Sequence, residues 1–317
     1  MNDDTGYFVG VPFKDYLAWP GTSRSRLWTL YRRTPAHFRW EMDHPQEIET
    51  PAMVEGTAVH TALLEPDRFK RKYVAEPPPP DGADKWDRRL KAHKAAWADV
   101  LEGVGDRTLL PRGDWDYYVG LGEAVRAHPL AGPLLARMER EVSIQWRHPE
   151  TGLLLKGRPD GVYVAEGGAI VVDLKSCRDA SPQRFGADAY RFGYLFQVAM
   201  YAAGVRATAE TEVEDVFIVA VEKEAPHPIA CYRVAPHQLD LGHLQVLDAL
   251  RQLSLCERYG DWPGYPEGIE DLQLPGYAGQ EWTPFADGLE QVLVARAKRA
   301  GRTLPAEPEE EEEVLAL

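Results

Sequence analysis

Two aspartates and a lysine are spaced so that they could hold a divalent cation. Asp160 follows a proline, while Asp173 and Lys175 come after Ala-Glu-Gly-Gly at 165–168, whose glycines favour a tight hairpin. A loop of two residues (166–167) or of four makes paired residue numbers sum to 333, so that Asp160 faces Asp173. A loop of three residues would shift this register by one and weaken the prediction.

The charges of the two aspartates predict a cation between them. Side chains directly opposed across a hairpin lie about 4.5–5.5 Å apart, and like charges there are destabilising. Oxygen ligands of this kind favour Mg²⁺ or Mn²⁺ over zinc. Lys175 projects from the same face of its strand as Asp173, while Ile170, Val172 and Leu174 face the opposite side and can be core.

This set of residues suits the hydrolysis of a phosphodiester bond. Metal ions could bind the phosphate and the attacking water, while the lysine orients that water and offsets the developing charge. The alternative for Asp173-Leu174-Lys175 alone is an ordinary surface ion pair, which contributes little to stability. The Pro159-Asp160 pair at the matching hairpin position favours a functional site.

The composition fits a globular protein but argues against a passive binder of nucleic acid. The 317 residues are 44% hydrophobic and carry a net charge of −14. Six glutamates and one arginine in residues 301–317 account for −5 of that charge. A protein of this charge that acts on DNA would need a focused basic groove, or metal ions in an acidic site.

The cysteines and the apolar runs predict a cytoplasmic protein. Cys177, Cys231 and Cys256 are scattered and odd in number, so they indicate neither a disulfide framework nor a four-thiolate cluster. No stretch reaches the roughly 18 apolar residues of a membrane span, and residues 1–10 lack the pattern of a signal peptide.

The elements that must position these residues form a helical N-terminal part and a later sheet. Runs rich in β-branched and aromatic residues predict strands at 142–147, 153–164, 169–175, 215–223 and 228–234. Helices are predicted at 85–100, 114–128, 188–204 and 236–259. The last of these carries a leucine stripe, which comprises Leu239, Leu244, Leu247, Leu250 and Leu253. This order predicts an α/β fold, with a mixed central sheet flanked by helices.

Pro159-Asp160 followed by Asp173-Leu174-Lys175 resembles the PD-(D/E)XK nuclease superfamily. The chain is similar to the RecE-type exonucleases (exodeoxyribonuclease VIII) of phages and prophages over most of residues 20–265. The matching segments, in order, are 23–40, 55–69, 141–146, 148–160, 172–185 and 196–204. Each segment alone is weak evidence, but their ordered conjunction is specific.

The resemblance implies a restriction-endonuclease-like core with an N-terminal helical elaboration. It predicts a single nuclease domain over residues 1–300, in which the helical part covers about 20–130 and the catalytic sheet core about 140–260. Residues 301–317 are expected to form a disordered acidic tail, because they are too acidic and too poor in aromatic residues to order themselves. The tail is expected to be a solubilising end, with a docking peptide as the alternative.

The resemblance also adds ligands to the two aspartates. His60 matches the histidine of a Gly-x-x-x-His pattern that begins at Gly56, and a hydrogen-bonded core or surface histidine is the alternative. Glu141 resembles an extra acidic residue of related phage exonucleases, although an exposed glutamate at the start of a strand fits equally well. The implied metal ligands are Asp160, Asp173, the Leu174 carbonyl and His60, around two Mg²⁺ ions for which Mn²⁺ can substitute.

Three further residues are implied to bind DNA. Gln197 and Tyr201 are four residues apart on one helix face and match the Gln-x-x-x-Tyr pattern of the superfamily, although Tyr201 could instead pack in the core. Arg158 could touch phosphates near the cleaved bond, or it could pair with a carboxylate. An N-terminal segment could also grip phosphates, although an amphipathic helix is favoured for it; its residues are Arg24, Arg26, Arg32, Arg33 and Arg39, with Trp28, Tyr31, Phe38 and Trp40.

The implied activity is Mg²⁺-dependent 5′ to 3′ digestion of linear double-stranded DNA. Such digestion leaves 3′ single-stranded overhangs for recombination, in the bacterial host cytoplasm if the chain is encoded by a phage. The resemblance further implies a ring-shaped homo-oligomer and a single-strand annealing protein as partner. The alternatives are a catalytically idle DNA-binding protein and a nuclease with structure-specific or endonucleolytic cleavage.

Overall fold

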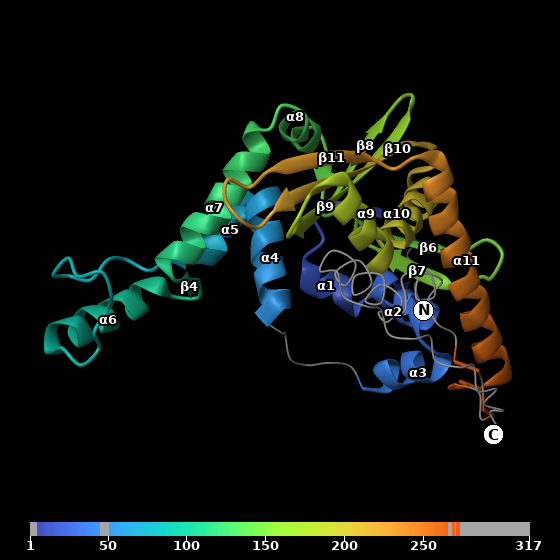
Figure 1. Ribbon diagram of the computed structural model, residues 1–317, viewed down its shortest axis with the longest axis horizontal. Coiled ribbons are helices and arrows are strands. Elements are labelled where there is room, and N and C mark those ends of the chain that lie inside the picture. The colour runs from blue at the N-terminus through green and yellow to red at the C-terminus, as the bar shows by residue number, and fades with distance from the viewer. Residues whose placement is uncertain (1–4, 45–50, 266–267, 270, 273–317) are drawn as a thin grey trace, which may run out of the picture. The chain divides into compact units, whose positions relative to one another are not determined.

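The computed structural model describes residues 5–44, 51–265, 268–269 and 271–272 (Figure 1). The chain divides after Tyr265 into two units, and the elements described below belong to the first, Met1–Tyr265. The domain boundary expected at residue 300 and the tail expected at 301–317 lie outside the described residues. No helix within the described ranges is long and apolar enough to cross a membrane.

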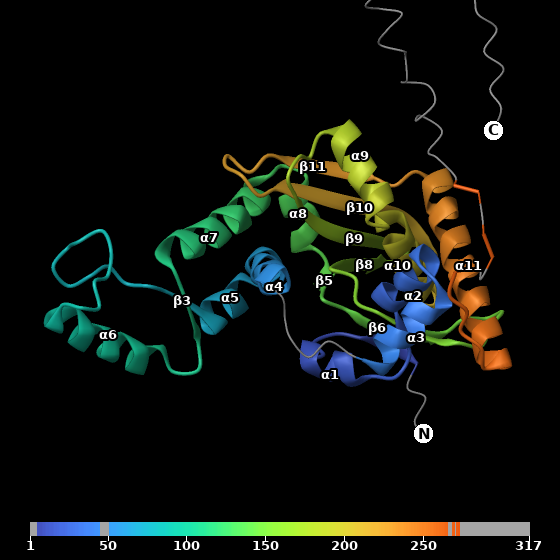
Figure 2. The same cartoon turned by 60° about the horizontal axis from the view of Figure 1, so that its bottom comes forward.

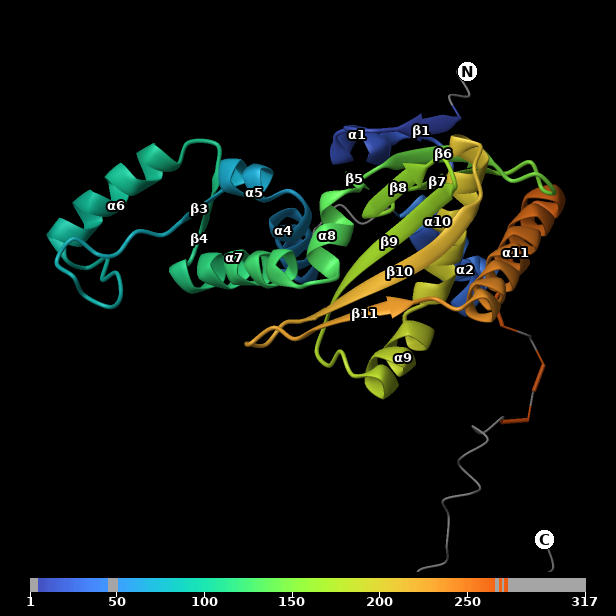
Figure 3. The ribbon, with the colours of Figure 1, turned by 90° about the horizontal axis from the view of Figure 1, so that it is seen from above.

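The central sheet has five strands in the spatial order β11–β10–β9–β8–β5 (Figure 3). These strands are β5 (Glu139–Arg140), β8 (Gly161–Ala165), β9 (Gly168–Cys177), β10 (Val213–Glu222) and β11 (Ile229–Arg233). The pairing of β9 with β10 is parallel, whereas the other three pairings are antiparallel. The sheet is therefore mixed, as the sequence predicts.

The hairpin between β8 and β9 has the predicted register. Ala165 pairs with Gly168 and Gly161 pairs with Val172, so that the paired numbers sum to 333 across a two-residue loop. Asp160 directly precedes Gly161, and continuing the register by one residue brings it beside Asp173. The local sequence therefore determines which two carboxylates meet.

The predicted strand at 153–164 is wrong, because the structure divides it between two sheets. β7 (Leu154–Gly157) lies in a four-stranded sheet, whereas β8 belongs to the central one. The break falls at 158–160, where Pro159 has no N–H to donate and restricts the residue before it. The second sheet has the order β1–β6–β7–β2, and its other strands are β1 (Gly6–Phe8), β2 (Thr22–Ser23) and β6 (Ser143–Arg147).

Helices cover both faces of the central sheet (Figure 2). One face packs against α2 (Arg24–Arg32), α10 (Tyr194–Ala209) and α11 (Pro236–Tyr259). The other face packs against α4 (Pro51–Leu64), α7 (Arg112–Ala127) and α8 (Ala131–Ala136). The remaining elements are α1 (Phe13–Ala18), α3 (Pro35–Asp43), α5 (Pro66–Lys72), α6 (Lys91–Val104), α9 (Pro182–Arg191), and the paired strands β3 (Tyr73–Ala75) and β4 (Thr108–Leu110).

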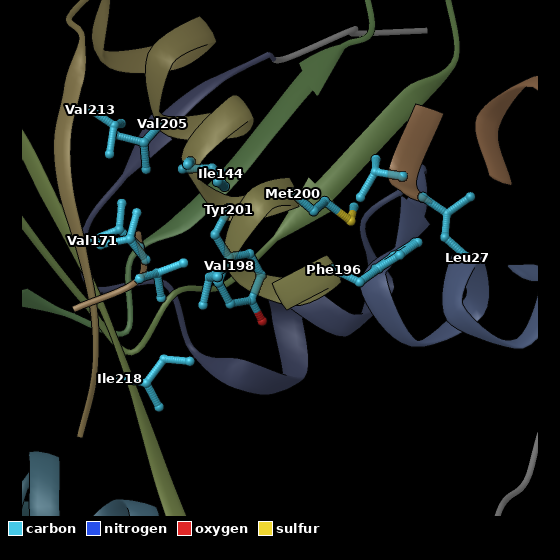
Figure 4. Packing of buried hydrophobic residues seen from close by; sticks show 14 of the residues in the cluster. Leu27, Ile144, Val171, Phe196, Val198, Met200, Tyr201, Val205, Val213 and Ile218 are labelled. Atoms are coloured by element: carbon cyan, nitrogen blue, oxygen red, sulfur yellow. The ribbon is translucent and has the colours of Figure 1, made fainter. Parts of the chain in front are cut away.

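The alternation of side chains along β9 divides the core into two clusters. Val171 faces α10, whereas Val172 and Leu174 face α4 and α7, and all three are fully buried. Figure 4 shows the first cluster, in which Phe196 and Met200 of α10 lie between the sheet and α2. Both faces of β9 are thus fixed by packing, which holds Asp173 and Lys175 on the α10 side.

We expect Gly242→Ala to destabilise the protein by about 1–3 kcal/mol, because α10 and α11 approach closely there. A methyl group at Gly242 would overlap the carbonyl oxygen of Leu195 and lie 2.8 Å from the Cβ atom of Ala199. The free energy of unfolding, measured with urea, tests this expectation. Gly186→Ala on exposed α9 is the matched control, since nothing lies within 4 Å of its added methyl; it should be neutral or stabilising, and equal losses in both variants would contradict the close packing.

Candidate active site

The Asp160 carboxylate accepts a backbone hydrogen bond from β9, as the carbonyl oxygen of a neighbouring strand would. Its Oδ2 atom accepts a hydrogen bond of 2.7 Å from the backbone N–H of Leu174, and the Asp160 residue is only 8% exposed. In an antiparallel ladder a residue directs its N–H and its C=O toward the same neighbour. The Leu174 carbonyl is therefore expected to point toward the Asp160 side, where the sequence predicts that it binds a metal ion.

Asp173 is fully buried beside Lys175 and Gln197. Its Oδ1 atom accepts a hydrogen bond of 3.0 Å from Gln197 Nε2, and its Oδ2 atom lies 2.5 Å from Lys175 Nζ. The Lys175 ammonium is therefore the ion-pair partner of Oδ2. Burial raises the pKa of Asp173; Lys175 opposes this rise, and the Asp160 charge adds to it.

His60 and Glu141 meet Asp160 from two other elements. His60 lies on α4, its Nδ1 atom 3.4 Å from Asp160 Oδ1, and about a third of its side chain is exposed. Burial lowers the pKa of His60, but the charge and the hydrogen bond of Asp160 outweigh burial and raise it above the usual value. Burial also opposes ionisation of Asp160, yet His60 and Lys175 hold its pKa below the usual value.

The ligand atoms of His60, Glu141 and Asp160 lie within 4.8 Å of one another. Glu141 has a φ of 53°, a left-handed conformation that a glutamate rarely adopts and that carries strain. Its backbone N–H donates to the Asp160 carbonyl at 3.1 Å. One imidazole and two carboxylates at this separation fit a divalent cation.

Asp173 lies outside this group of three, although the sequence predicts it as a metal ligand. Its two oxygens contact Lys175 and Gln197 instead. Glu141, for which an exposed position was the alternative, lies within the group. The structure therefore brings all five predicted catalytic residues to one end of the hairpin, with different immediate neighbours for the two aspartates.

Arg158 pairs with a carboxylate, which is the alternative that the sequence left open for it. Its Nε atom donates to Glu141 at 2.6 Å, and its Nη1 atom donates to the Val11 carbonyl at 3.0 Å and to Ser143 Oγ at 2.7 Å. Only 7% of its side chain is exposed. These bonds orient Glu141 toward Asp160, and the expected contact of Arg158 with DNA phosphates would require them to break.

Tyr201 is also buried, in agreement with the alternative of core packing. It is 8% exposed and belongs to the cluster of Figure 4, and its hydroxyl group accepts a hydrogen bond of 3.2 Å from Gln197 Nε2. This burial favours core packing for Tyr201, and its contact with DNA stays a prediction. The Gln-x-x-x-Tyr spacing places Gln197 and Tyr201 on one helix face, and from this face Gln197 binds the Asp173 carboxylate.

Two residues beside the site were not predicted there. The ring centroid of Tyr194 lies 5.0 Å from Lys175 Nζ, and Tyr194 shares a helix face with Gln197 three residues later, a spacing that could have revealed it. Arg24 belongs to the basic N-terminal segment. Burial lowers its pKa, while Tyr201 and Asp173 oppose that change, so Arg24 lies within electrostatic range of the site.

Comparisons with solved structures bear on the fold. A crystal structure of a provisionally assigned exonuclease from Eubacterium rectale has a TM-score of 0.53 and 13% identity, covering 86% of this chain and 99% of that one. The solved structure of SSO0001 has 14% identity over 76% of this chain and 81% of that one, and its TM-score of 0.34 is too low to support an argument. The first of these likenesses, at 13% identity, shows a shared fold alone. A search of curated proteins found no match.

A protein-family model gives the assignment. The model of the PDDEXK-like domain of unknown function (DUF3799) matches residues 23–275, which is most of the chain. This match confirms the PD-(D/E)XK core predicted from the hairpin motif. The chain therefore belongs to the family of PDDEXK-like domains of unknown function.

Proposed function

We propose that this protein is a metal-dependent exodeoxyribonuclease that digests linear double-stranded DNA from 5′ to 3′. The observation that carries the proposal is the convergence of two buried aspartates, a lysine, a histidine and a glutamate at one end of the β8–β9 hairpin. The PDDEXK-like family supports a nuclease. The direction of digestion and the preference for duplex rest on the resemblance to RecE-type exonucleases.

The residues of the site have separable roles in this proposal. His60, Glu141 and Asp160 would hold a divalent cation. The resemblance to PD-(D/E)XK nucleases adds the Asp173 carboxylate, whose oxygens contact Lys175 and Gln197, as a further ligand. Bound Mg²⁺ or Mn²⁺ supplies Lewis-acid stabilisation of the phosphate and lowers the pKa of water. Lys175 orients the attacking water.

The supporting residues fix these groups in place. Gln197 holds the Asp173 carboxylate through the hydrogen bond to Oδ1, and Tyr201 accepts a second bond from the same amide. Arg158 holds Glu141 in its strained conformation. The Leu174 N–H fixes Asp160. Each reacting group therefore has a neighbour that limits its motion before substrate binds.

The experiment that tests the proposal uses linear duplex with a 5′-phosphate, labelled at either end in separate reactions with Mg²⁺. We expect mononucleotides to be released from the 5′ end, which leaves the complementary strand as a 3′ single-stranded overhang. We expect no digestion in EDTA. Closed circular DNA should remain intact. Cleavage of circles would indicate an endonuclease, and a gel shift without digestion would indicate a catalytically idle binding protein.

Removal of metal should also lower thermal stability, because the cation would bind the folded state alone. A free ion concentration of 100 times Kd adds about 2.7 kcal/mol to the free energy of unfolding. We therefore expect the melting temperature to rise with Mn²⁺ or Mg²⁺ and to fall on addition of EDTA, with NaCl at equal ionic strength as the control. An unchanged melting temperature in saturating Mn²⁺ would argue against a metal site.

The assembly and the partner belong to the same proposal. The resemblance to RecE-type exonucleases supports a ring-shaped homo-oligomer around duplex DNA, and a single-strand annealing protein that receives the 3′ overhang. Light scattering after gel filtration measures the oligomeric state. A monomer that digests DNA processively would contradict the ring and would leave the nuclease proposal intact.

A further inference from the structure

Two exposed aromatic side chains flank an arginine where α9 meets α10. Tyr190 is 63% exposed and Phe192 is 44% exposed, and Arg191 between them is exposed as well. The guanidinium carbon of Arg191 lies 5.4 Å from the centroid of the Phe192 ring. We call residues 190–192 the aromatic turn. Single exposed aromatic residues are common on protein surfaces, so its position decides whether it has a function.

A short series of contacts connects the aromatic turn to the proposed catalytic residues. The ring centroids of Phe192 and Tyr194 lie 6.0 Å apart. The ring of Tyr194 lies 5.0 Å from Lys175 Nζ, which in turn lies 2.5 Å from Asp173. One aromatic ring therefore separates Phe192 from the lysine assigned to the attacking water.

Trp28 and Arg24 of α2 hold the backbone at the end of the aromatic turn in place. Gly193 has a φ of 70°, and an added Cβ there would lie 2.5 Å from the Trp28 ring, so Trp28 packs directly on this glycine. Arg24 Nη2 donates hydrogen bonds to the carbonyl oxygens of Phe192 and Gly193, the second at 2.9 Å. The fold thus fixes the backbone and leaves the aromatic side chains toward solvent, which is the arrangement of a rigid binding element.

We propose that the aromatic turn stacks an unpaired nucleobase of the strand whose backbone enters the catalytic site. The inference rests on the proposed nuclease function and adds a contact with single-stranded DNA to it. Flat rings beside a basic side chain are the chemistry that binds single strands without sequence preference. Among the residues that the structure describes, no carboxylate lies within ion-pair distance of Arg191, so its charge is open to a phosphate.

The location beside Lys175 favours DNA over a protein partner as the occupant. A strand whose phosphate reaches Asp160 and Asp173 must pass the neighbouring surface with its next nucleotides. The aromatic turn belongs to that surface through Tyr194. A base stacked there would be withdrawn from its duplex partner, so the turn would also favour separation of the two strands at the cleavage site.

Binding of short single-stranded oligonucleotides to the full chain tests the aromatic turn. The oligonucleotides carry one abasic nucleotide at successive positions from the 5′ end, and anisotropy is measured with Ca²⁺ in place of Mg²⁺. We expect the wild type to bind about tenfold more weakly when one particular base is removed. Phe192→Ala should bind the intact and abasic oligonucleotides equally. Phe192→Trp should restore the difference, whereas Phe192→Leu should not.

Tyr259→Ala is the matched control, because Tyr259 is an exposed aromatic residue at the end of α11 and 75% exposed. It should retain the wild-type preference for the intact base. The proposal is overturned if Phe192→Ala binds the intact oligonucleotide as tightly as the wild type. The proposal is also overturned if Phe192→Ala, compared with the wild type, loses the same factor of affinity for the intact oligonucleotide and for every abasic one.

Cleavage with Mg²⁺, measured separately, distinguishes this inference from the proposed function. Digestion of duplex by a protein without base discrimination would refute the aromatic turn and retain the nuclease. A protein that discriminates the base but does not digest duplex would support the aromatic turn and refute the nuclease.

Discussion

Asp173→Asn is expected to abolish DNA hydrolysis while the protein remains folded. Asparagine has the shape of aspartate, and its oxygen can still accept the hydrogen bond from Gln197 Nε2. The substitution removes the buried negative charge that pairs with Lys175 and that a divalent cation would need. Loss of several kcal/mol of transition-state stabilisation corresponds to a decrease in kcat/KM of about 10³-fold or more. Initial rates on linear duplex measure this decrease.

Asp215→Asn is the matched control for that substitution. Asp215 also lies on a strand of the central sheet and pairs with a cation, Arg233, but it is on β10 and its partner is largely exposed. Its replacement should change kcat/KM by less than about twofold, because an exposed ion pair contributes little. Circular dichroism and urea denaturation must show that both variants fold. Wild-type digestion by folded Asp173→Asn would mean that the active site lies elsewhere.

The metal-dependent rise in melting temperature gives a second measurement on the same variant. Wild-type protein should be stabilised by Mn²⁺, whereas Asp173→Asn should show a much smaller shift if this carboxylate helps to hold the cation. His60, Glu141 and Asp160 remain in the variant, so a weakened shift is expected rather than complete loss. An unchanged shift with lost activity would restrict Asp173 to holding Lys175.

The hairpin was predictable because its determinants are local. The two-residue loop and the alternation of side chains fix the register, so the meeting of Asp160 with Asp173 and the burial of Val172 and Leu174 follow from about twenty consecutive residues. The long last helix was predicted with the bounds that the structure has, 236–259, since its apolar period is strong.

Long-range packing was not predictable from the same patterns. The prediction that the leucine stripe of the last helix is its buried face is only partly correct. Leu244 is 64% exposed, while Val246 and Ala249 are buried. The spacing of apolar residues along a helix does not by itself say which of two adjacent stripes a neighbouring helix will cover. Arg158 and Tyr201 have polar ends that suit DNA equally well, and their contacts inside the protein, with Glu141 and with the core around α10, involve residues distant in sequence.

Lys175→Met is expected to separate the orientation of water from the binding of metal. Methionine has a similar length and occupies the same space, since the Lys175 side chain is only 14% exposed, but it has no charge and no donor. We expect kcat to fall about 10²- to 10³-fold, the range found when one preorganised donor is removed from an active site. The Mn²⁺-dependent rise in melting temperature should persist, because Asp173 loses a competing cation and keeps its own charge.

The unpaired Asp173 carboxylate could destabilise Lys175→Met without metal, since breaking a buried pair costs about 3–5 kcal/mol. Lys175→Arg therefore provides a second variant that retains the positive charge; its planar guanidinium cannot replace a compact ammonium, so a loss of kcat is again expected. Lys223→Met is the control, because Lys223 also pairs with a carboxylate, Glu55 at 2.9 Å, but its side chain is 43% exposed. If folded Lys175→Met loses the metal-dependent stabilisation together with activity, then the lysine supports the metal site as a whole, and the assignment of the attacking water to it is wrong.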